Sequence, residues 1–296
     1  MPDLFKSEFV RALVEGTVLL PGAVAALYGM ATRRATRASV RWSGILWAPG
    51  LLAGFLGGYA AAYRDFSFPP HTVLSWLPWL ALSGATLVAV GSWSAGRYGA
   101  HAARAITCAA SSFILLRPIL RQERPSMAFM VWLVVAVLWF LLWSGLTSAR
   151  NDPARDDQSA AGVALLVIAA GFAFVAPLSG SIELARLGGS LAVTLGVGLF
   201  FSLLVAHTRW NLPTAEVPIL ILGALLVDLW FYAGASVSVM TWLIVSLAAA
   251  CVAIIVMRRR NIAGGWSVIA PGLAALPPLA LAIWTAVRAF RHNGGY

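Results

Sequence analysis

Long apolar runs, separated by short connections that carry arginine, recur along the whole chain. A helix needs about 20 mostly apolar residues to cross the roughly 30 Å hydrocarbon core of a bilayer. Because that core offers no water to unpaired backbone groups, runs of this length are expected to be helical. The sequence therefore predicts an all-α, polytopic integral membrane protein, a bundle of about ten transmembrane helices. The predicted spans are residues 9–31, 42–63, 72–94, 100–120, 126–147, 159–180, 186–207, 216–236, 237–257 and 266–288.

Composition supports a membrane protein and excludes a separate soluble domain. Of 296 residues, 60% are hydrophobic and only 11% are charged, whereas a soluble domain carries roughly 25% charged residues. The longest polar stretch, residues 148–159, is too short to bury a core of its own. We therefore expect one transmembrane domain over residues 1–296, which can be divided into two halves, 1–147 and 160–296, joined by this connector.

Arginine placement bears on orientation and on the number of crossings. Ten spans put the connection at residues 32–41 and the cluster Arg258–Arg260 on one side, which the positive-inside rule assigns to the cytoplasm. Both termini would then lie outside. The first, fourth and last runs carry charges or prolines, and if the first run is re-entrant the chain crosses nine times.

Two short patterns concern helix packing. The sequence Gly234-Ala235-Ser236 interrupts an apolar stretch too long for one crossing, and it predicts a tight helical hairpin there. Small residues also recur between residues 188 and 198 and predict a seam of close helix contact. They are Gly188, Gly189, Ser190, Thr194 and Gly198.

Asp228 is the most informative charged residue. It lies near the middle of the predicted span 216–236, and between Glu216 and Arg258 no other residue is Asp, Glu, Lys, Arg or His. An unpaired charge at mid-bilayer costs at least about 2.5–3.5 kcal/mol. Asp228 is therefore predicted to be a proton or cation site in a transport path, or else a hydrogen-bonded carboxyl that fixes helix packing. Tyr232, one turn later, is a possible hydrogen-bond donor to it.

Glu15, in the first run, is the second intramembrane carboxylate. Arg11 precedes it by four residues, so the two can form an ion pair on one helix face near the interface. The alternative is a carboxylate that faces the bundle next to Pro21. There, carbonyls freed by the proline would help to hold a cation.

A cationic face is predicted at the start of the fourth run. Arg97, His101 and Arg104 are spaced by four and three residues, which places them on one side of a helix. This face either binds an anion or a lipid headgroup or simply anchors the helix at the interface. At the other end of the run, Arg117 is expected to extend to the interface together with Arg121 and Arg124.

No motif identifies an enzyme, a metal or a cofactor. The cysteines Cys108 and Cys251 are too few for a structural zinc site, and no two histidines lie within spans to bind haem. The arginines sit at the ends of apolar runs rather than on a polar domain, which argues against nucleic-acid binding. We therefore expect no catalytic residues, no metal and no cofactor.

The function favoured by these patterns is transport of a small solute or ion, with Asp228 and Glu15 as candidates for proton coupling. The first alternative is a non-catalytic scaffold or complex subunit. The second is a membrane enzyme that acts on lipid and binds a headgroup at Arg97, His101 and Arg104. The expected partners are the lipid bilayer, a small solute or ion, and further copies or other subunits in the membrane. The richness in Ala, Gly and Arg favours a bacterial inner membrane.

Overall fold

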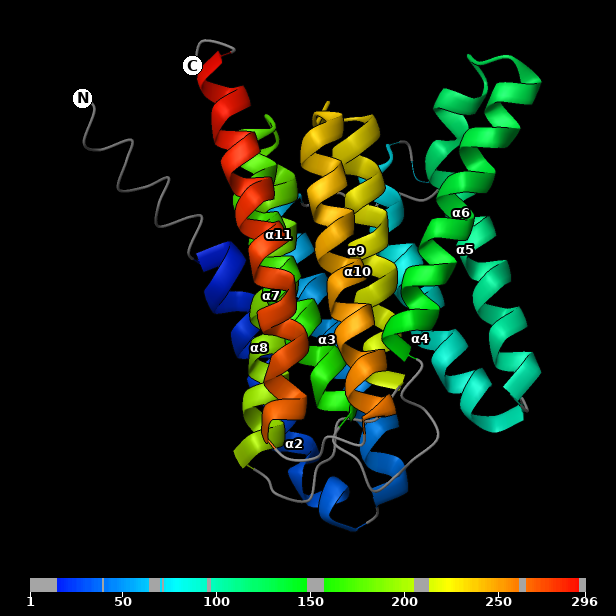
Figure 1. Ribbon diagram of the computed structural model, residues 1–296. Helices are drawn as coiled ribbons and strands as arrows, with labels where there is room; N and C mark the ends of the chain where they lie inside the picture. The colour runs from blue at the N-terminus through cyan, green and yellow to red at the C-terminus, as the bar shows by residue number, and fades with distance from the viewer. Residues whose placement is uncertain are drawn as a thin grey trace.

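The protein is a bundle of long helices (Figure 1). The computed structural model describes residues 15–38, 40–63, 70, 72–94, 97–147, 157–204, 213–260 and 265–292. Within these residues there are ten α-helices and no strand. The helices are α2 (Leu20–Ala38), α3 (Val40–Ala62), α4 (Leu77–Ser94), α5 (Arg97–Leu120), α6 (Pro125–Thr147), α7 (Asp157–Leu178), α8 (Ile182–Leu204), α9 (Pro213–Phe231), α10 (Val237–Arg259) and α11 (Gly265–His292). A π-helical turn, η1 (Glu15–Leu19), precedes α2, and a 3₁₀ turn, η2 (Leu74–Trp76), precedes α4.

An all-helical fold with several membrane-length helices is confirmed. Among the described residues, six segments are long and apolar enough to cross a membrane. They are His101–Leu120, Pro125–Thr147, Ser159–Leu178, Ile182–Phe201, Val237–Arg259 and Gly265–His292. Two shorter apolar segments, Thr17–Tyr28 and Pro49–Ala62, lie in the first helices. The chain is thus a multi-pass membrane protein, but the predicted count of ten spans is not confirmed.

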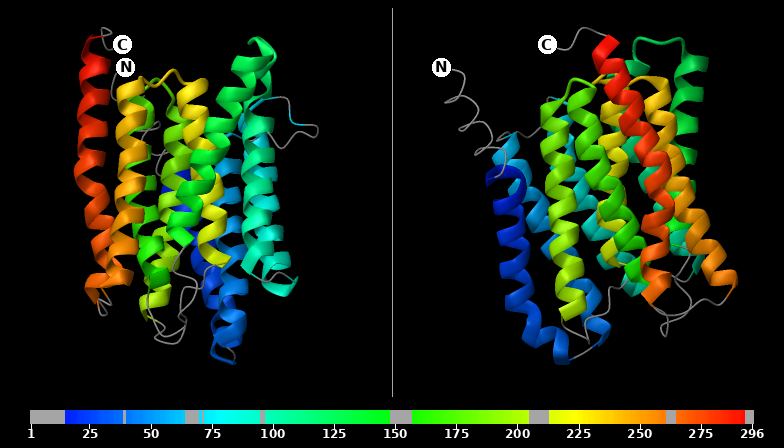
Figure 2. Two further views of the ribbon diagram at one scale, coloured as in Figure 1. Left: turned by 45° about the vertical axis from the view of Figure 1, so that its right-hand side comes forward. Right: turned by 60° about the vertical axis from the view of Figure 1, so that its left-hand side comes forward.

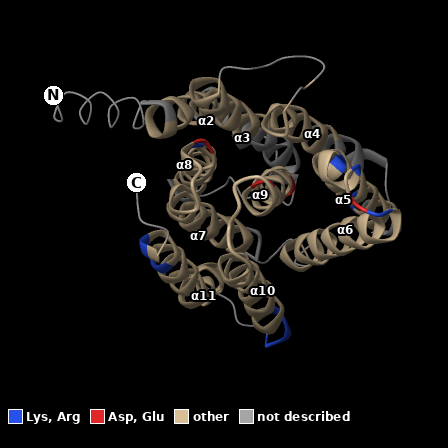
Figure 3. Ribbon diagram, turned by 90° about the horizontal axis from the view of Figure 1, so that it is seen from above, with Lys and Arg blue, Asp and Glu red and all other residues tan. Residues whose placement is uncertain are grey.

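Helix α9 lies at the centre of the bundle. Successive helices run in alternating directions (Figure 2), and seen along the bundle the other helices surround α9 (Figure 3). It contacts α3, α4 and α5 on the N-terminal side of the chain and α7, α8 and α10 on the C-terminal side. Nearly every side chain from Val217 to Leu229 is buried, as expected for a helix that is apolar all round. Its charged residues therefore have protein, not lipid, as their surroundings.

Small residues allow α3 and α8 to approach closely. A methyl group added at Gly54 would lie 2.6 Å from the Thr194 side chain, and one at Gly58 would overlap Ser190. The Ser190 and Thr194 hydroxyls donate to carbonyls one turn earlier in α8, at 2.8 and 2.7 Å, so each hydroxyl has a hydrogen-bond partner. The predicted close helix contact is confirmed at Ser190 and Thr194 of α8, and its partner is the face of α3 that carries Gly54 and Gly58.

The turn between α9 and α10 decides where Asp228 lies. Gly234 adopts a positive φ of 70°, and the Ser236 side chain accepts a hydrogen bond from the Val239 amide at the start of α10. The predicted hairpin is therefore confirmed. However, α9 ends at Phe231, because the Asp228 carbonyl accepts from the amides of Tyr232 and Ala233 as the chain turns away. The predicted span to residue 236 was too long, and Asp228 lies in the last turn of α9 rather than near its middle.

Candidate functional site

The Asp228 carboxyl is buried without a complete set of hydrogen bonds. Its residue is 4% exposed, and its Oδ2 atom has no hydrogen-bond partner among the described residues. A buried polar atom in this position costs free energy unless it gains a proton, a cation or a bound water as partner. Any of these three partners would therefore stabilise the buried Asp228 carboxyl.

Tyr232 does not serve as the donor that the sequence suggested. Its hydroxyl donates instead to the Leu115 carbonyl of α5 at 2.7 Å, and the ring is 39% exposed. Tyr232 thereby joins the end of α9 to α5. Pro118 in α5 lacks an amide hydrogen, so the carbonyl four residues earlier loses its helical partner. That carbonyl belongs to Ile114 and is not the Leu115 carbonyl that Tyr232 contacts.

The first turn of α8 brings two charged residues to the same end of the bundle. Glu183 is exposed and close enough for its charge to act on Asp228, with the repulsive sign of two carboxylates. Arg186, on the next turn, donates from Nη2 to the Ala61 carbonyl of α3 at 3.4 Å, while its Nε is buried and has no partner in the described part of the chain. The Glu183 carboxylate thus adds a negative charge near Asp228, which the position of Asp228 in the sequence did not indicate.

At the opposite end of α9, Glu216 forms a buried ion pair with Arg104 of α5. The Arg104 Nε and Nη2 atoms both donate to Glu216 Oε1, at 3.1 and 2.6 Å. The two side chains are only 6% and 15% exposed. The sequence analysis did not anticipate this pair, because 112 residues separate its members and no local spacing relates them.

The predicted cationic face at the start of α5 is divided in the structure. His101 is exposed, whereas Arg104 is buried and its charge is matched by Glu216. Arg97 begins α5, but its side chain lies outside the described residues. Binding of an anion or a lipid headgroup at this face stays a prediction.

Glu15 is the first residue of the π-helical turn η1. Such turns are rare and occur frequently at functional sites. The turn packs against α8, where Gly189 lies directly against Thr17. Neither the Glu15 side chain nor Arg11, its predicted partner, is among the described residues, so the role of Glu15 stays a prediction.

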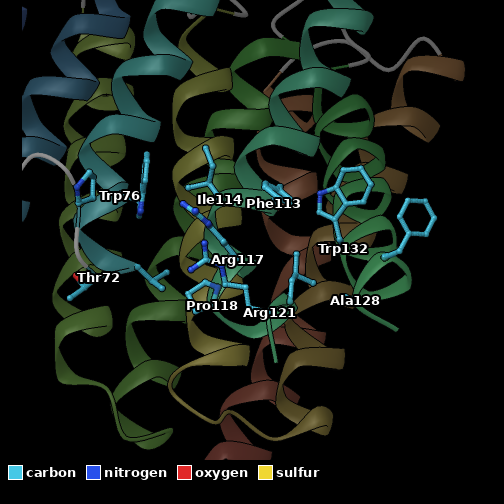
Figure 4. Close-up of a pocket in the computed structure, with 13 residues that line it drawn as sticks. Thr72, Trp76, Phe113, Ile114, Arg117, Pro118, Arg121, Ala128 and Trp132 are labelled. Carbon is cyan, nitrogen blue, oxygen red and sulfur yellow. The ribbon is translucent and has the colours of Figure 1, made fainter. Parts of the chain in front are cut away.

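A groove of about 1020 Å³ opens between the start of α4 and the α5–α6 hairpin (Figure 4). Aromatic rings and the side chains of Arg117 and Arg121 line it. A smaller cavity of about 60 Å³ lies between α6, α9 and α10, with walls that are almost entirely apolar. Asp228 lines neither space.

No group of three His, Cys, Asp or Glu side chains that could hold a metal ion occurs within the described residues. No known protein family matches the sequence, and neither a curated protein nor a solved structure matches the chain. The geometry and chemistry of the helices are therefore the basis for the functional proposal.

Proposed function

We propose that the protein transports a small solute or ion across a membrane, and that Asp228 couples transport to protons by binding and releasing one. The observation that carries this proposal is the buried Oδ2 of Asp228 on the central helix, which has no hydrogen-bond partner within the described residues. Ionisable residues within membrane bundles commonly mark ion pathways and proton relays.

The surroundings of Asp228 support exchange of a proton. The residue lies three positions before the end of α9, so it is close to the turn that joins α9 to α10. Because Asp228 is buried, its ionised form is disfavoured unless a cation lies close by. Since α9 touches helices from both halves of the chain, a change in the charge of Asp228 would act on several helix contacts at once.

Proton binding at Asp228 is tested directly by infrared difference spectroscopy on the purified protein between acid and alkaline pH. We expect a carbonyl-stretch band of a protonated carboxyl that Asp228→Asn removes. The matched control is Glu123→Gln, because Glu123 is exposed in the α5–α6 connection. An unchanged band in Asp228→Asn would contradict proton binding at this residue.

Transport is tested in liposomes that contain a pH-sensitive dye and are exposed to a panel of amino acids, monocarboxylates, sugars and organic cations. We expect at least one class to cause proton movement with the wild-type protein and with Glu123→Gln, but not with Asp228→Asn. Asp228→Glu should retain part of the response because it keeps a titratable group. A full response in a correctly folded Asp228→Asn would refute the coupling role.

A second candidate is a non-catalytic scaffold or complex subunit in which Asp228 stabilises helix packing. It is favoured because Asp228 lies in a packed seam and lines neither of the two cavities. Crosslinking followed by native electrophoresis of membranes separates the two candidates. A scaffold should migrate in a larger complex that Asp228→Asn weakens, whereas a solitary monomer argues against this function.

A further inference from the structure

The groove between η2 and the α5–α6 hairpin has one apolar wall that is already organised. The Trp132 ring packs against Phe113 at 6.4 Å and against Phe129 at 5.6 Å between ring centroids. Its indole Nε1 donates to the Ala109 carbonyl at 3.0 Å, so the only polar atom of the ring is satisfied. Trp76 lies on the other side of the groove in Figure 4. The aromatic surfaces therefore offer an apolar site between them.

Two arginines give this apolar groove a positive charge. Arg117 and Arg121 lie one helical turn apart at the end of α5, and both side chains are exposed and line the groove. Figure 4 shows them between Trp76 and Trp132. Within the part of the chain that the structure describes, no carboxylate forms an ion pair with either guanidinium.

This combination indicates the chemistry of the occupant. An uncharged molecule would fill the apolar part but leave both guanidinium groups without an anion. Inorganic phosphate would pair with the arginines but leave the aromatic walls empty. Guanidinium groups bind phosphate oxygens in a bidentate manner, and a volume near 1000 Å³ is at the upper end for small-molecule sites.

We propose that the groove binds an anionic phospholipid, with its phosphate on Arg117 and Arg121 and an acyl chain against Trp76, Phe113 and Trp132. The α5–α6 connection lies at the end of the bundle opposite to the Arg258–Arg260 end of α10 (Figure 1). The lipid therefore comes from the leaflet on the α5–α6 side. This site is separate from Asp228 and does not depend on the transport proposal.

Native mass spectrometry of the full-length protein in detergent tests the site by titration with phosphatidylglycerol and, separately, with phosphatidylcholine of the same acyl chains. We expect one saturable phosphatidylglycerol site that is clearly tighter than any phosphatidylcholine site. Each arginine near a membrane surface contributes roughly five-fold to the affinity for an anionic lipid. Arg117→Gln combined with Arg121→Gln should therefore weaken phosphatidylglycerol binding about 25-fold.

Two further variants separate a built site from surface charge. Arg124→Gln removes an exposed arginine in the same connection that does not line the groove, and it should leave the affinity unchanged. Ala128→Trp keeps every charge but places a large ring inside the groove, since Ala128 lines it, and it should weaken binding at least ten-fold.

Three results would overturn the proposal. Equal affinities for the two phospholipids would show that the negative charge of the lipid does not contribute to binding. Wild-type affinity in Ala128→Trp would show that the lipid lies elsewhere. Tighter binding of decyl phosphate than of phosphatidylglycerol would show that the site takes a free amphiphile from solution rather than a membrane lipid.

Discussion

The ion pair between Arg104 and Glu216 allows a quantitative test of how α5 is fastened to the central helix. Both hydrogen bonds converge on Glu216 Oε1, and the side chains are 6% and 15% exposed. The small contribution of exposed ion pairs, about 0–1 kcal/mol, does not apply at this burial. We predict that Glu216→Leu or Arg104→Met alone strongly destabilises the bundle.

The magnitude follows from two opposing effects. At 4 Å and an effective dielectric constant of 20, two unit charges attract by about 4 kcal/mol. Moving each ion out of water costs several kcal/mol, so the intact pair contributes little net stability. Removing one member leaves the other buried without a partner, which costs about 3–5 kcal/mol. Replacing both by apolar residues removes both charges, and the double variant should lose less than about 2 kcal/mol.

The assay is a double-mutant cycle on the free energy of unfolding, measured by titration with a denaturing detergent and followed by tryptophan fluorescence. The four proteins are wild type, Glu216→Leu, Arg104→Met and the double variant. Arg124→Met is the matched control, since Arg124 is exposed, and it should change stability by less than about 0.5 kcal/mol. Single variants that lose under about 1 kcal/mol, or a double variant that loses the sum of the two, would refute this reasoning.

Three further predictions concern the packing and the topology of the bundle. Gly58→Ala should destabilise the fold by about 1–3 kcal/mol in the same unfolding assay, because the added methyl group overlaps α8. The control is Gly265→Ala, which should not destabilise the fold, because no atom of the described residues lies within 4 Å of the added methyl group. Gly234→Ala should cost about 1–2 kcal/mol, because its φ of 70° is unfavourable for a residue with a side chain; no loss would mean that the turn relaxes. In a background without native cysteines, Gln122→Cys and Arg259→Cys should react with an impermeant maleimide from opposite sides of the membrane, because five helices separate the two positions. Labelling from the same side would contradict the alternating directions of α6 to α10.

Much of the helix pattern was predictable from residue type alone. Residues 127–146 carry no charge and are mostly apolar, and they form most of α6. The hairpin at Gly234 was predictable because glycine tolerates the positive φ that a tight turn needs. The end of α9 at Phe231 was not predictable, because residues 232–236 carry no charge or proline that would end an apolar run there. Hydropathy therefore placed the end of that span five residues beyond the end of α9 and misplaced Asp228 relative to the helix end.

The candidate site was only partly predictable for a related reason. The free-energy cost of a charge in an apolar environment singled out Asp228. The structure places it on the central helix, with one oxygen that has no partner in the part of the chain that is described. The same reasoning treated Arg104 as part of an open cationic face, because a helical spacing shows which residues share a face but not what lies opposite. Its partner Glu216 marked only the boundary of a predicted span.

By itself, the sequence determined the membrane environment, the helical class and the approximate helix ends, because each depends on local properties of the chain. These properties are the hydrophobicity over about twenty residues, the positions of proline and glycine, and the arginines near the ends of the spans. Only the tertiary structure decided that α9 is central and that Glu216 neutralises Arg104. It also decided that Tyr232 donates to α5 rather than to Asp228. The aromatic groove that Arg117 and Arg121 line is likewise a result of the tertiary structure. These facts depend on which helix faces which. Since a helix in lipid can bury any of several apolar faces at similar free energy, the choice rests on long-range contacts such as Gly58 against Ser190, which no single segment contains.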